Sequence, residues 1–212
     1  MIISHKYGFI FVKRAKTAGT SIEVLLSPLC GPADVFTPLN PPEDGHQPRN
    51  YEDLRNDDEV PASFLEHLPA WFLAEHLPDA WNHYFSFCVE RNPWDKLVSA
   101  YHFHRAQPDV DPNLSFTAYL PFGLRLFGNF RDYADSEGRI LVDRVLRYER
   151  LDAELAEVCA QLGIAFAGEL QVRAKGGYRP PGDHYRSYYD SYTRDLVARE
   201  YAREIDEFGY AF

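Results

Sequence analysis

The sequence has few cysteines, and they do not form a motif. Its 212 residues include three of them, Cys30, Cys88 and Cys159, far apart along the chain. No pair has the spacing of a metal site, and three is the wrong number for a disulfide framework. We therefore expect free or buried thiols in a reducing compartment.

A long hydrophobic run is also missing from the first residues. The segment M-I-I-S-H-K-Y-G-F-I-F-V-K-R-A-K has an apolar stretch of only a few residues. Such a stretch is too short for the core of a signal peptide and far too short to cross a bilayer. We expect a soluble, cytoplasmic protein without a membrane span.

Positive charge is scarce. The chain has 22 Lys and Arg against 32 Asp and Glu, which gives a formal net charge of -10. A general nucleic-acid binder, or a protein that coats an anionic membrane, is usually basic. The composition therefore argues against both kinds of partner, although a local basic cleft remains compatible with it.

Apolar residues are plentiful, at 45%, and aromatic residues make up 15%. This composition suits one domain over residues 1–212, with a core built on large rings. Short β-prone runs alternate with helical patterns along the chain, and this alternation predicts an α/β fold with a central, mainly parallel sheet flanked by helices. The predicted strands lie within residues 2–12, 84–90 and 142–149, and the main helices within 20–26, 69–77, 93–101, 151–162 and 191–208.

Capping signals mark two of the helix starts. Thr20 and Glu23 have the spacing of a capping box. Asn92 suits an N-cap, and Pro93 suits the first helical position. Between these two starts, residues 28–62 are rich in Pro and Gly, and we expect substrate-facing loops there because long irregular segments of small domains are often functional.

The first candidate site is the loop between the first strand and the first helix, K-T-A-G-T-S over residues 16–21. A helix N-terminus exposes unpaired N–H groups that attract anions. Lys16 adds a positive charge, Gly19 lets the backbone approach an anion, and Thr17, Thr20 and Ser21 add hydroxyl donors. The order differs from a Walker A loop, where Gly precedes the Lys. The alternative is an ordinary strand-to-helix turn.

The second candidate site follows the next strand. Arg91 lies at the end of that strand, and Ser99 is two turns into the following helix. A guanidinium and a hydroxyl can converge on one phosphate. Alternatively, Arg91 pairs with Asp95 and Ser99 faces solvent. Both candidate sites follow parallel strands, and open α/β sheets bind ligands at that edge.

Together these segments resemble sulfotransferases that use PAPS (3′-phosphoadenosine-5′-phosphosulfate). F-I-F-V-K-R-A-K-T-A-G-T-S-I-E is similar to their 5′-phosphosulfate loop, and F-C-V-E-R-N-P-W-D-K-L-V-S-A-Y to their 3′-phosphate segment in the carbohydrate (family 2, Golgi-type) branch. Residues 145–155 and 188–210 also resemble that branch, whereas 28–62 and 107–135 match weakly. Ala15 and Lys96 depart from the Pro and Arg that many members carry. The resemblance implies a single P-loop-like three-layer domain.

The resemblance also implies roles for the two sites. Lys16 would stabilise the charge that grows on the leaving phosphate. Arg91 and Ser99 would hold the 3′-phosphate. PAP, the desulfated nucleotide, would be the product, no metal is expected, and the acceptor would be an alcohol of a carbohydrate or small molecule. The backbone that would hold the 5′-phosphate comprises Thr17, Ala18, Gly19, Thr20 and Ser21.

The acceptor hydroxyl needs a base, and members of this branch carry a His shortly before the second strand. His67 matches that position. An imidazole can accept a proton near neutral pH, so His67 is the candidate base. Competitors are His76, Glu66 and Glu75, and a purely structural role for His67 is the alternative.

Two further features of the sequence bear on the function. Lys175 lies in a Gly-rich basic loop that could contact the donor phosphates, or could be ordinary surface. His102 and His104 have an i, i+2 spacing that points them apart on a helix, which argues against a metal pair. The alternative functions are a PAPS- or PAP-binding module without catalysis and a P-loop nucleotide-kinase-like enzyme.

Overall fold

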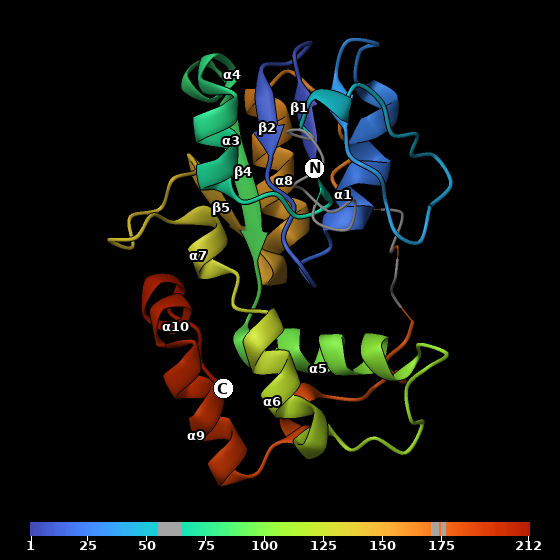
Figure 1. Cartoon of the computed structure of the whole chain (residues 1–212), viewed down its shortest axis with the longest axis vertical. Coiled ribbons are helices and arrows are strands. Elements are labelled where there is room, and N and C mark those ends of the chain that lie inside the picture. The colour runs from blue at the N-terminus through green and yellow to red at the C-terminus, as the bar shows by residue number, and fades with distance from the viewer. Residues whose placement is uncertain (55–64, 171–173, 175–176) are drawn as a thin grey trace. The chain divides into compact units, whose positions relative to one another are not determined.

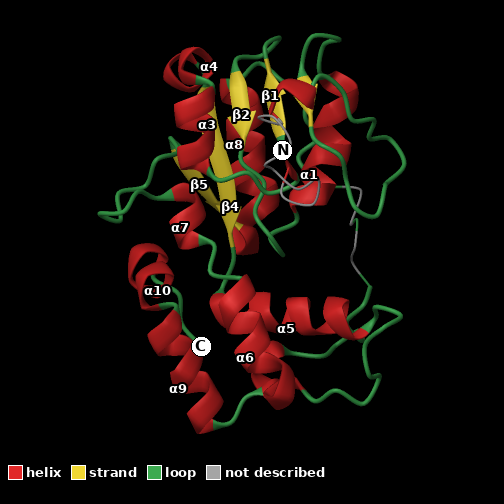
Figure 2. Ribbon diagram, in the orientation of Figure 1, coloured by secondary structure: helices red, strands yellow, loops and turns green. Residues whose placement is uncertain are grey.

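The computed structural model describes residues 1–54, 65–170, 174 and 177–212. Five of its strands, all within residues 2–147, form one mixed sheet (Figures 1 and 2). The strand order is β3-β1-β2-β4-β5. β2 pairs with β4 and β4 with β5 in parallel, whereas β1 is antiparallel to both β2 and β3. Only β1 therefore runs against the other strands, and the predicted α/β fold with a mainly parallel sheet is confirmed. The strands are β1 (Ile2–Ser4), β2 (Phe9–Phe11), β3 (Val35–Phe36), β4 (Phe85–Glu90) and β5 (Arg144–Arg147).

The single strand predicted within residues 2–12, on the run Y-G-F-I-F-V, is present as β2, and the structure adds β1 before it. This segment is the β1–β2 hairpin, and Gly8 has a φ of 65° in its turn. A positive φ is easy for glycine because it has no Cβ. The polar residues between Ser4 and Gly8 were the signal for a turn.

The chain divides into two compact units, each built from two segments. The first comprises Met1–Glu90 and Arg131–Ala174, and the second comprises Arg91–Phe130 and Lys175–Phe212. A single domain over residues 1–212 stays a prediction.

In the first unit, α1 and α8 cover one face of the sheet. Phe11 and Phe87 lie on this face, with ring centroids 5.1 Å apart, and pack in one buried cluster with Ile22 of α1 and Leu155 of α8. Burial of each such side chain contributes about 1.5–3 kcal/mol. The helical elements of this unit are α1 (Gly19–Leu26), η1 (Ser27–Leu29), η2 (Glu52–Leu54), α3 (Ala70–His76), α4 (Pro78–His83), η3 (Tyr148–Arg150), α8 (Leu151–Gln161) and, from its second residue, α7 (Phe130–Tyr133).

The other face of the sheet carries polar groups at the end of β4. Successive side chains of a strand point to opposite faces, so Glu90 points away from the face that holds Phe87. The Tyr133 hydroxyl of α7 donates to Glu90 over 3.0 Å, and Figure 1 shows α3 on this face as well. Helices on both faces give the three layers that the sequence resemblance implied.

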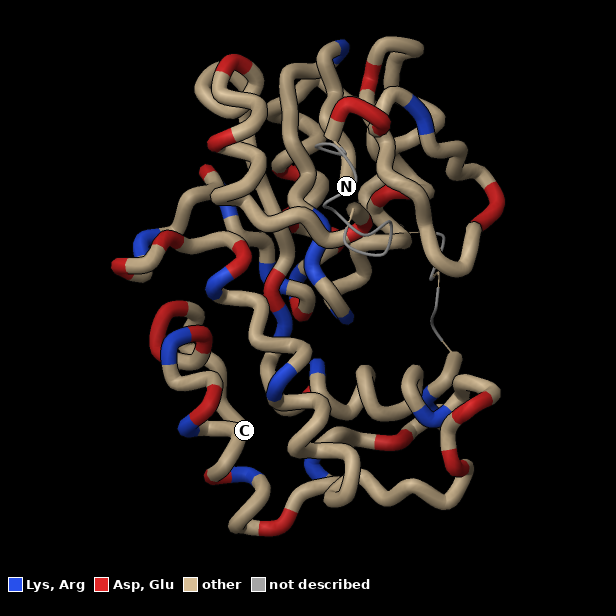
Figure 3. Tube along the Cα trace, in the orientation of Figure 1, with Lys and Arg blue, Asp and Glu red and all other residues tan. Residues whose placement is uncertain are grey.

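The second unit is a group of helices around an aromatic core, which includes Trp94, Tyr101, Phe116 and Tyr201. Its elements are α5 (Pro93–Arg105), α6 (Phe116–Leu126), η4 (Tyr185–Tyr188), α9 (Ser191–Glu200) and α10 (Ala202–Phe208). Figure 3 shows Lys or Arg alternating with Asp or Glu along α9 and α10. The sequence predicted a single helix over 191–208, but the structure has two helices there, which meet at Tyr201.

Two details of this unit bear on the sequence predictions. The Asn92 side chain accepts the N–H groups of Trp94 and Asp95, which confirms the predicted N-cap of α5. Pro121 lies inside α6, although an internal proline usually breaks or kinks a helix. Burial of the apolar face of α6, including Phe116 and Leu120, outweighs the cost of about 3 kcal/mol for an internal proline.

Among the described residues, no helix is both long and apolar enough to cross a bilayer.

Candidate functional site

The loop after β2 has an unusual backbone. Lys16 and Ala18 have φ values of 62° and 63°, and Thr17 between them is not in the left-handed region. Alternation of this kind turns successive N–H groups toward one side, where they can surround an anion. The Thr17 hydroxyl donates to the carbonyl of Arg14 over 3.1 Å, so it fixes the loop and cannot also donate that proton to a ligand.

α1 begins directly after this loop. Its N-cap is Ala18, without a side-chain cap bond, so the predicted capping box of Thr20 and Glu23 is wrong. The Glu23 carboxylate is fully buried and lies 2.8 Å from Nζ of Lys13. The first N–H groups of α1 therefore have no side-chain cap, which leaves them available to an anion.

The segment from residue 13 to residue 16 contains three cations, Lys13, Arg14 and Lys16. Lys13 contacts both Glu23 and Glu66. Arg14 lies 2.8 Å from a carboxylate oxygen of Asp132. Lys13 and Arg14 are almost fully buried, whereas Lys16 is half-buried. Lys16 is therefore the cation of this loop that a ligand can reach most easily.

Gly19 has a packing role that the sequence did not reveal. A Cβ at this position would lie 2.5 Å from Cγ of Lys13. The sequence predicted that Gly19 lets the backbone approach an anion, but the space beside it holds the Lys13 side chain. The backbone N–H of Gly19 remains part of the loop that could hold a phosphate.

His67 lies beside the backbone of the same loop. Its Nδ1 is 3.3 Å from the carbonyl oxygen of Lys13. Because a carbonyl only accepts, Nδ1 carries the proton and Nε2 keeps its lone pair. Burial, together with the nearby cations Lys13 and Arg14, lowers the pKa of His67 to about 3. The imidazole is therefore neutral at physiological pH.

The competitors of His67 lie in other surroundings. The carboxylate of Glu66 is held by Lys13, and Glu75 is an exposed residue of α3. His76 stacks on Phe72 with ring centroids 3.8 Å apart. His67 is thus the candidate that contacts the backbone of the Lys16 loop.

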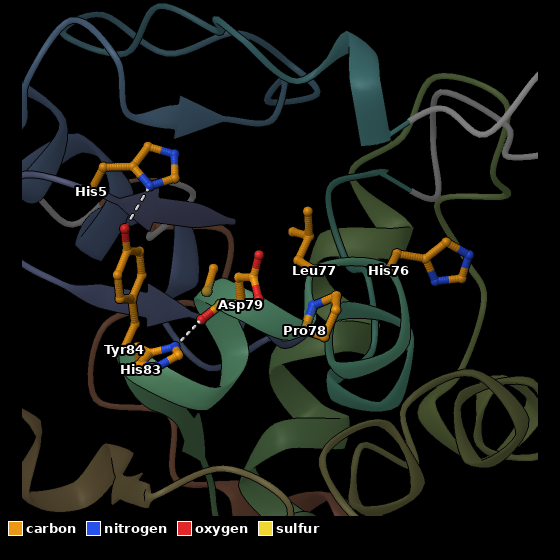
Figure 4. A pocket seen from close by; sticks show the side chains of 8 residues that line it. His5, His76, Leu77, Pro78, Asp79, His83 and Tyr84 are labelled. Atoms are coloured by element: carbon orange, nitrogen blue, oxygen red, sulfur yellow. Dashed lines mark hydrogen bonds between the residues drawn. The ribbon is translucent and has the colours of Figure 1, made fainter.

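His76 also lines a pocket of about 470 Å³, together with His5, His83 and Tyr84. His5 follows β1 and Tyr84 precedes β4, so the pocket lies at the amino ends of β2 and β4. Figure 4 shows the hydrogen bond of 2.9 Å between His5 and Tyr84, and His76 with its ring directed away from that pair. The Lys16 loop follows the opposite, carboxyl end of β2.

The residues of the second candidate site belong to the second unit. Nε and Nη2 of Arg91 donate to one carboxylate oxygen of Asp95, over 2.9 and 2.6 Å. The ion pair between Arg91 and Asp95, which the sequence analysis gave as an alternative, is therefore found in the structure. Ser99 is half-buried one turn further along α5. Arg179, which the sequence did not single out, donates to the other oxygen of Asp95 over 2.6 Å.

The remaining sequence candidates have separate positions. Lys175 lies outside the described residues. His102 accepts or donates a hydrogen bond of 2.7 Å with the Tyr188 hydroxyl, whereas the ring of His104 packs 4.9 Å from that of Phe122. Within the described part of the chain, no group of three or more His, Cys, Asp or Glu side chains could hold a metal ion.

Comparisons with known proteins give one sequence relative and several structural neighbours. No family model matches the chain. An uncharacterized protein of Archaeoglobus fulgidus is 33% identical over 110 residues, which are 50% of this chain and 89% of that protein.

Two solved structures share the architecture. Mouse sulfotransferase SULT7A1 complexed with PAP aligns with a TM-score of 0.57 and 12% identity, over 95% of this chain and 86% of that one. Retinol dehydratase in a complex with retinol and PAP aligns with a TM-score of 0.53 and 14% identity, over 99% of this chain and 84% of that one. The chain therefore belongs to the same family as the Archaeoglobus fulgidus protein, and its fold is that of the sulfotransferases.

Proposed function

We propose that this protein is a sulfotransferase that moves a sulfuryl group from PAPS to an acceptor hydroxyl. The observation that carries the proposal is the loop after β2, where the left-handed residues Lys16 and Ala18 lead into the start of α1. A cation and a set of backbone N–H groups meet there at the carboxyl end of a parallel strand. The shared fold supports the proposal, since both structural neighbours are complexes with PAP.

The donor would be held by residues that follow two neighbouring strands. Backbone N–H groups of Thr17 to Ser21 would bind the 5′-phosphate. The hydroxyls of Thr20 and Ser21 would be further donors in this segment. β2 and β4 are adjacent and parallel, so the segments that follow the two strands leave the sheet at the same edge. Arg91 follows β4 directly. We propose that Arg91 and Ser99 bind the 3′-phosphate and that Lys175 contacts the donor phosphates.

Lys16 would carry most of the stabilisation of the transition state. In an in-line transfer the acceptor oxygen forms a bond to sulfur while the bond from sulfur to the bridging oxygen breaks, and that electron pair stays on the leaving phosphate of PAP. A fixed cation beside the bridging oxygen lowers the energy of the transition state more than that of the bound donor. Sulfuryl transfer resembles phosphoryl transfer in this need for positioning and charge stabilisation.

His67 would accept the proton of the acceptor hydroxyl. Its Nδ1 donates to the Lys13 carbonyl, and this bond orients the ring and leaves the lone pair on Nε2. A neutral imidazole with one free lone pair can act as a base at neutral pH.

We propose an alcohol of a carbohydrate or small molecule as the acceptor. The segments around residues 87–101 and 145–155 support the carbohydrate, Golgi-type branch, because these stretches resemble it in sequence. The neighbour complexed with retinol and PAP is an example of this fold with a small alcohol bound. We also propose a cytoplasmic location and partners other than nucleic acid.

A titration followed by a transfer assay tests this function. Calorimetry should show heat with PAP and little with ATP and Mg²⁺, since PAP has the 3′-phosphate that Arg91 would bind. A panel of acceptors is then incubated with ³⁵S-labelled PAPS, and label should move to at least one alcohol. Lys16→Ala and His67→Ala should both lose transfer. No heat with PAP would end the proposal.

A second candidate is a PAP- or PAPS-binding module without catalysis. The pKa of His67, lowered to about 3, favours it, because an imidazole that holds protons so weakly is a weak base. PAP binding without label transfer to any acceptor would indicate this module. A melting temperature raised by ATP and Mg²⁺ but not by PAP would instead indicate a nucleotide kinase.

A further inference from the structure

Asp95 lies between two arginines that come from distant parts of the sequence. Arg91, Asp95 and Ser99 are four residues apart, so from the start of α5 they follow one face of the helix. Arg179 reaches the same face from the segment between α8 and η4. All four residues belong to the second unit.

The carboxylate of Asp95 divides its two oxygens between the guanidinium groups. Oδ2 accepts from Nε and Nη2 of Arg91, over 2.9 and 2.6 Å. Oδ1 accepts from Nη1 of Arg179 over 2.6 Å. The side chains of Arg91, Asp95 and Arg179 are only 10%, 18% and 22% exposed. Partial burial and charge-assisted bonds fix both guanidinium planes.

The charges of this cluster favour an anionic ligand. Burial would raise the pKa of Asp95, but Arg91 and then Arg179 outweigh it and hold the pKa below its usual value. The carboxylate is therefore ionised, and the three side chains carry one net positive charge. Without that carboxylate, two neighbouring guanidinium groups would repel one another.

Arg179 has donor capacity beyond its bond to Asp95. A guanidinium has five N–H donors, and the Nε atom of Arg179 is buried without a hydrogen-bond partner in the described part of the chain. A buried donor without a partner costs about 1–3 kcal/mol. A phosphate oxygen near this cluster would remove that cost.

The segment that carries Arg179 is also fastened to α5 by aromatic contacts. Tyr178 packs against Phe103 with ring centroids 5.4 Å apart. The hydroxyl of Tyr188 lies 2.7 Å from Nε2 of His102. These contacts hold the backbone on both sides of Arg179, so its guanidinium is positioned by the fold as well as by Asp95.

We propose that Asp95 is a positioning residue for donor recognition, which holds Arg91 and Arg179 as a pair that binds the 3′-phosphate of the donor nucleotide. The protein would thereby distinguish 3′-phosphorylated adenine nucleotides from those with a free 3′-hydroxyl. This inference rests on the proposed function. It adds a second arginine to the phosphate site and gives the acidic residue a role in selectivity.

The test compares PAP with 5′-AMP, which lacks only the 3′-phosphate. Calorimetry of Asp95→Asn should give a PAP Kd about 10- to 100-fold higher than that of the parent protein, because charge-assisted bonds each contribute about 1.5–3 kcal/mol. The Kd for 5′-AMP should change less than about twofold, since 5′-AMP does not reach the arginine pair. In turnover, KM for PAPS should rise while KM for the acceptor stays constant.

Asp195→Asn is the matched control. Asp195 pairs with Arg194 over 2.8 Å in the same unit, and both side chains are largely exposed. This change also removes one carboxylate from one arginine, and neither nucleotide should bind differently.

Arg179→Gln gives a second, independent measurement if Asp95→Asn folds poorly. It should weaken PAP in the same selective way, and the double variant should lose less than the sum of the two single losses. Equal weakening of PAP and 5′-AMP in either variant, or unchanged PAP affinity, would overturn the role of Asp95. A parent protein that binds PAP no better than 5′-AMP would overturn the proposed function itself.

Discussion

The degree of burial distinguishes the three cations of the loop after β2, since Lys13 and Arg14 are buried and Lys16 is half-buried. Lys13 and Arg14 each contact carboxylates inside the fold. Removing one partner of such a buried pair typically costs about 3–5 kcal/mol, because the remaining charge stays buried. Substitutions of Lys13 or Arg14 would therefore report on stability, and only Lys16 is suited to a test of chemistry.

Lys16→Ala should lower kcat by about 100- to 1,000-fold, the usual effect of removing one group that stabilises transition-state charge. PAP affinity should fall by about tenfold at most, since backbone N–H groups would still hold the 5′-phosphate. Single-turnover transfer of ³⁵S from PAPS and calorimetry with PAP measure the two effects. A loss of PAP binding as large as the loss of kcat would contradict a role in the chemical step.

His67 should give an unusual pH profile. Its pKa of about 3 means that the neutral form, which can accept a proton, is present throughout the range from pH 5 to 8. The profile of kcat/KM reports the free enzyme, so it should show no acidic limb centred near 6.5. Initial rates between pH 5 and 8 test this, with His67→Ala as the inactive control. A fall in kcat/KM with a midpoint near 6.5 would show that His67 titrates normally or that another His is the base.

At the scale of the elements, the start of α1 is set by contacts of the loop that precedes it. Ala18 in the left-handed region provides no side-chain cap, and the loop is closed instead by the Thr17 hydroxyl. Gly19 must lack a Cβ because the Lys13 side chain passes beside it. The position of the proposed anion-binding N–H groups therefore depends on an ion pair beneath them.

Gly19→Ala should destabilise the protein by about 1–3 kcal/mol, the usual cost of overpacking a filled interior site. The new Cβ would lie 2.5 Å from Cγ of Lys13, which is itself held by Glu23 and Glu66. Urea unfolding followed by fluorescence measures the change. Gly128→Ala is the control, because nothing lies within 4 Å of its Cβ position; an equal effect at both positions would contradict the packing role of Gly19.

At the scale of the whole molecule, two compact units are built from interleaved segments. The chain passes from one unit to the other three times, after Glu90, Phe130 and Ala174. Neither unit is a continuous stretch of sequence, so neither can form before both of its segments have been made. This arrangement suits the expectation of one domain over residues 1–212.

Scanning calorimetry should therefore give one cooperative transition, with a calorimetric enthalpy equal to the van't Hoff enthalpy. PAP should raise the temperature of this single transition, because a ligand that binds only the folded state stabilises it by mass action. A control scan without nucleotide defines the baseline. Two separate transitions, or a shift in only part of the heat absorption, would show that the units unfold independently.

The sequence alone predicted the elements whose signals are local. The apolar run of β4, the strand at β5 and the Asn92 cap of α5 all depend on neighbouring residues. β1, and with it the β1–β2 hairpin, was missed because the three residues Ile2–Ser4 form too short a run to be recognised as a strand. The break at Tyr201 between α9 and α10 left no such signal in the sequence.

For the candidate site, too, the sequence predicted the local features and the tertiary structure added the distant contacts. The sequence by itself determined which residue types follow β2 and β4, and hence the kind of ligand, because a cation, glycine and hydroxyls before a helix favour a phosphate. Only the tertiary structure decided that Lys13 and Arg14 are held by carboxylates, that Gly19 makes room for Lys13, and that Asp95 joins two arginines. Those outcomes depend on partners up to 118 residues away along the chain, Arg14 with Asp132 being the most distant, and contacts of that length have no signature in local sequence.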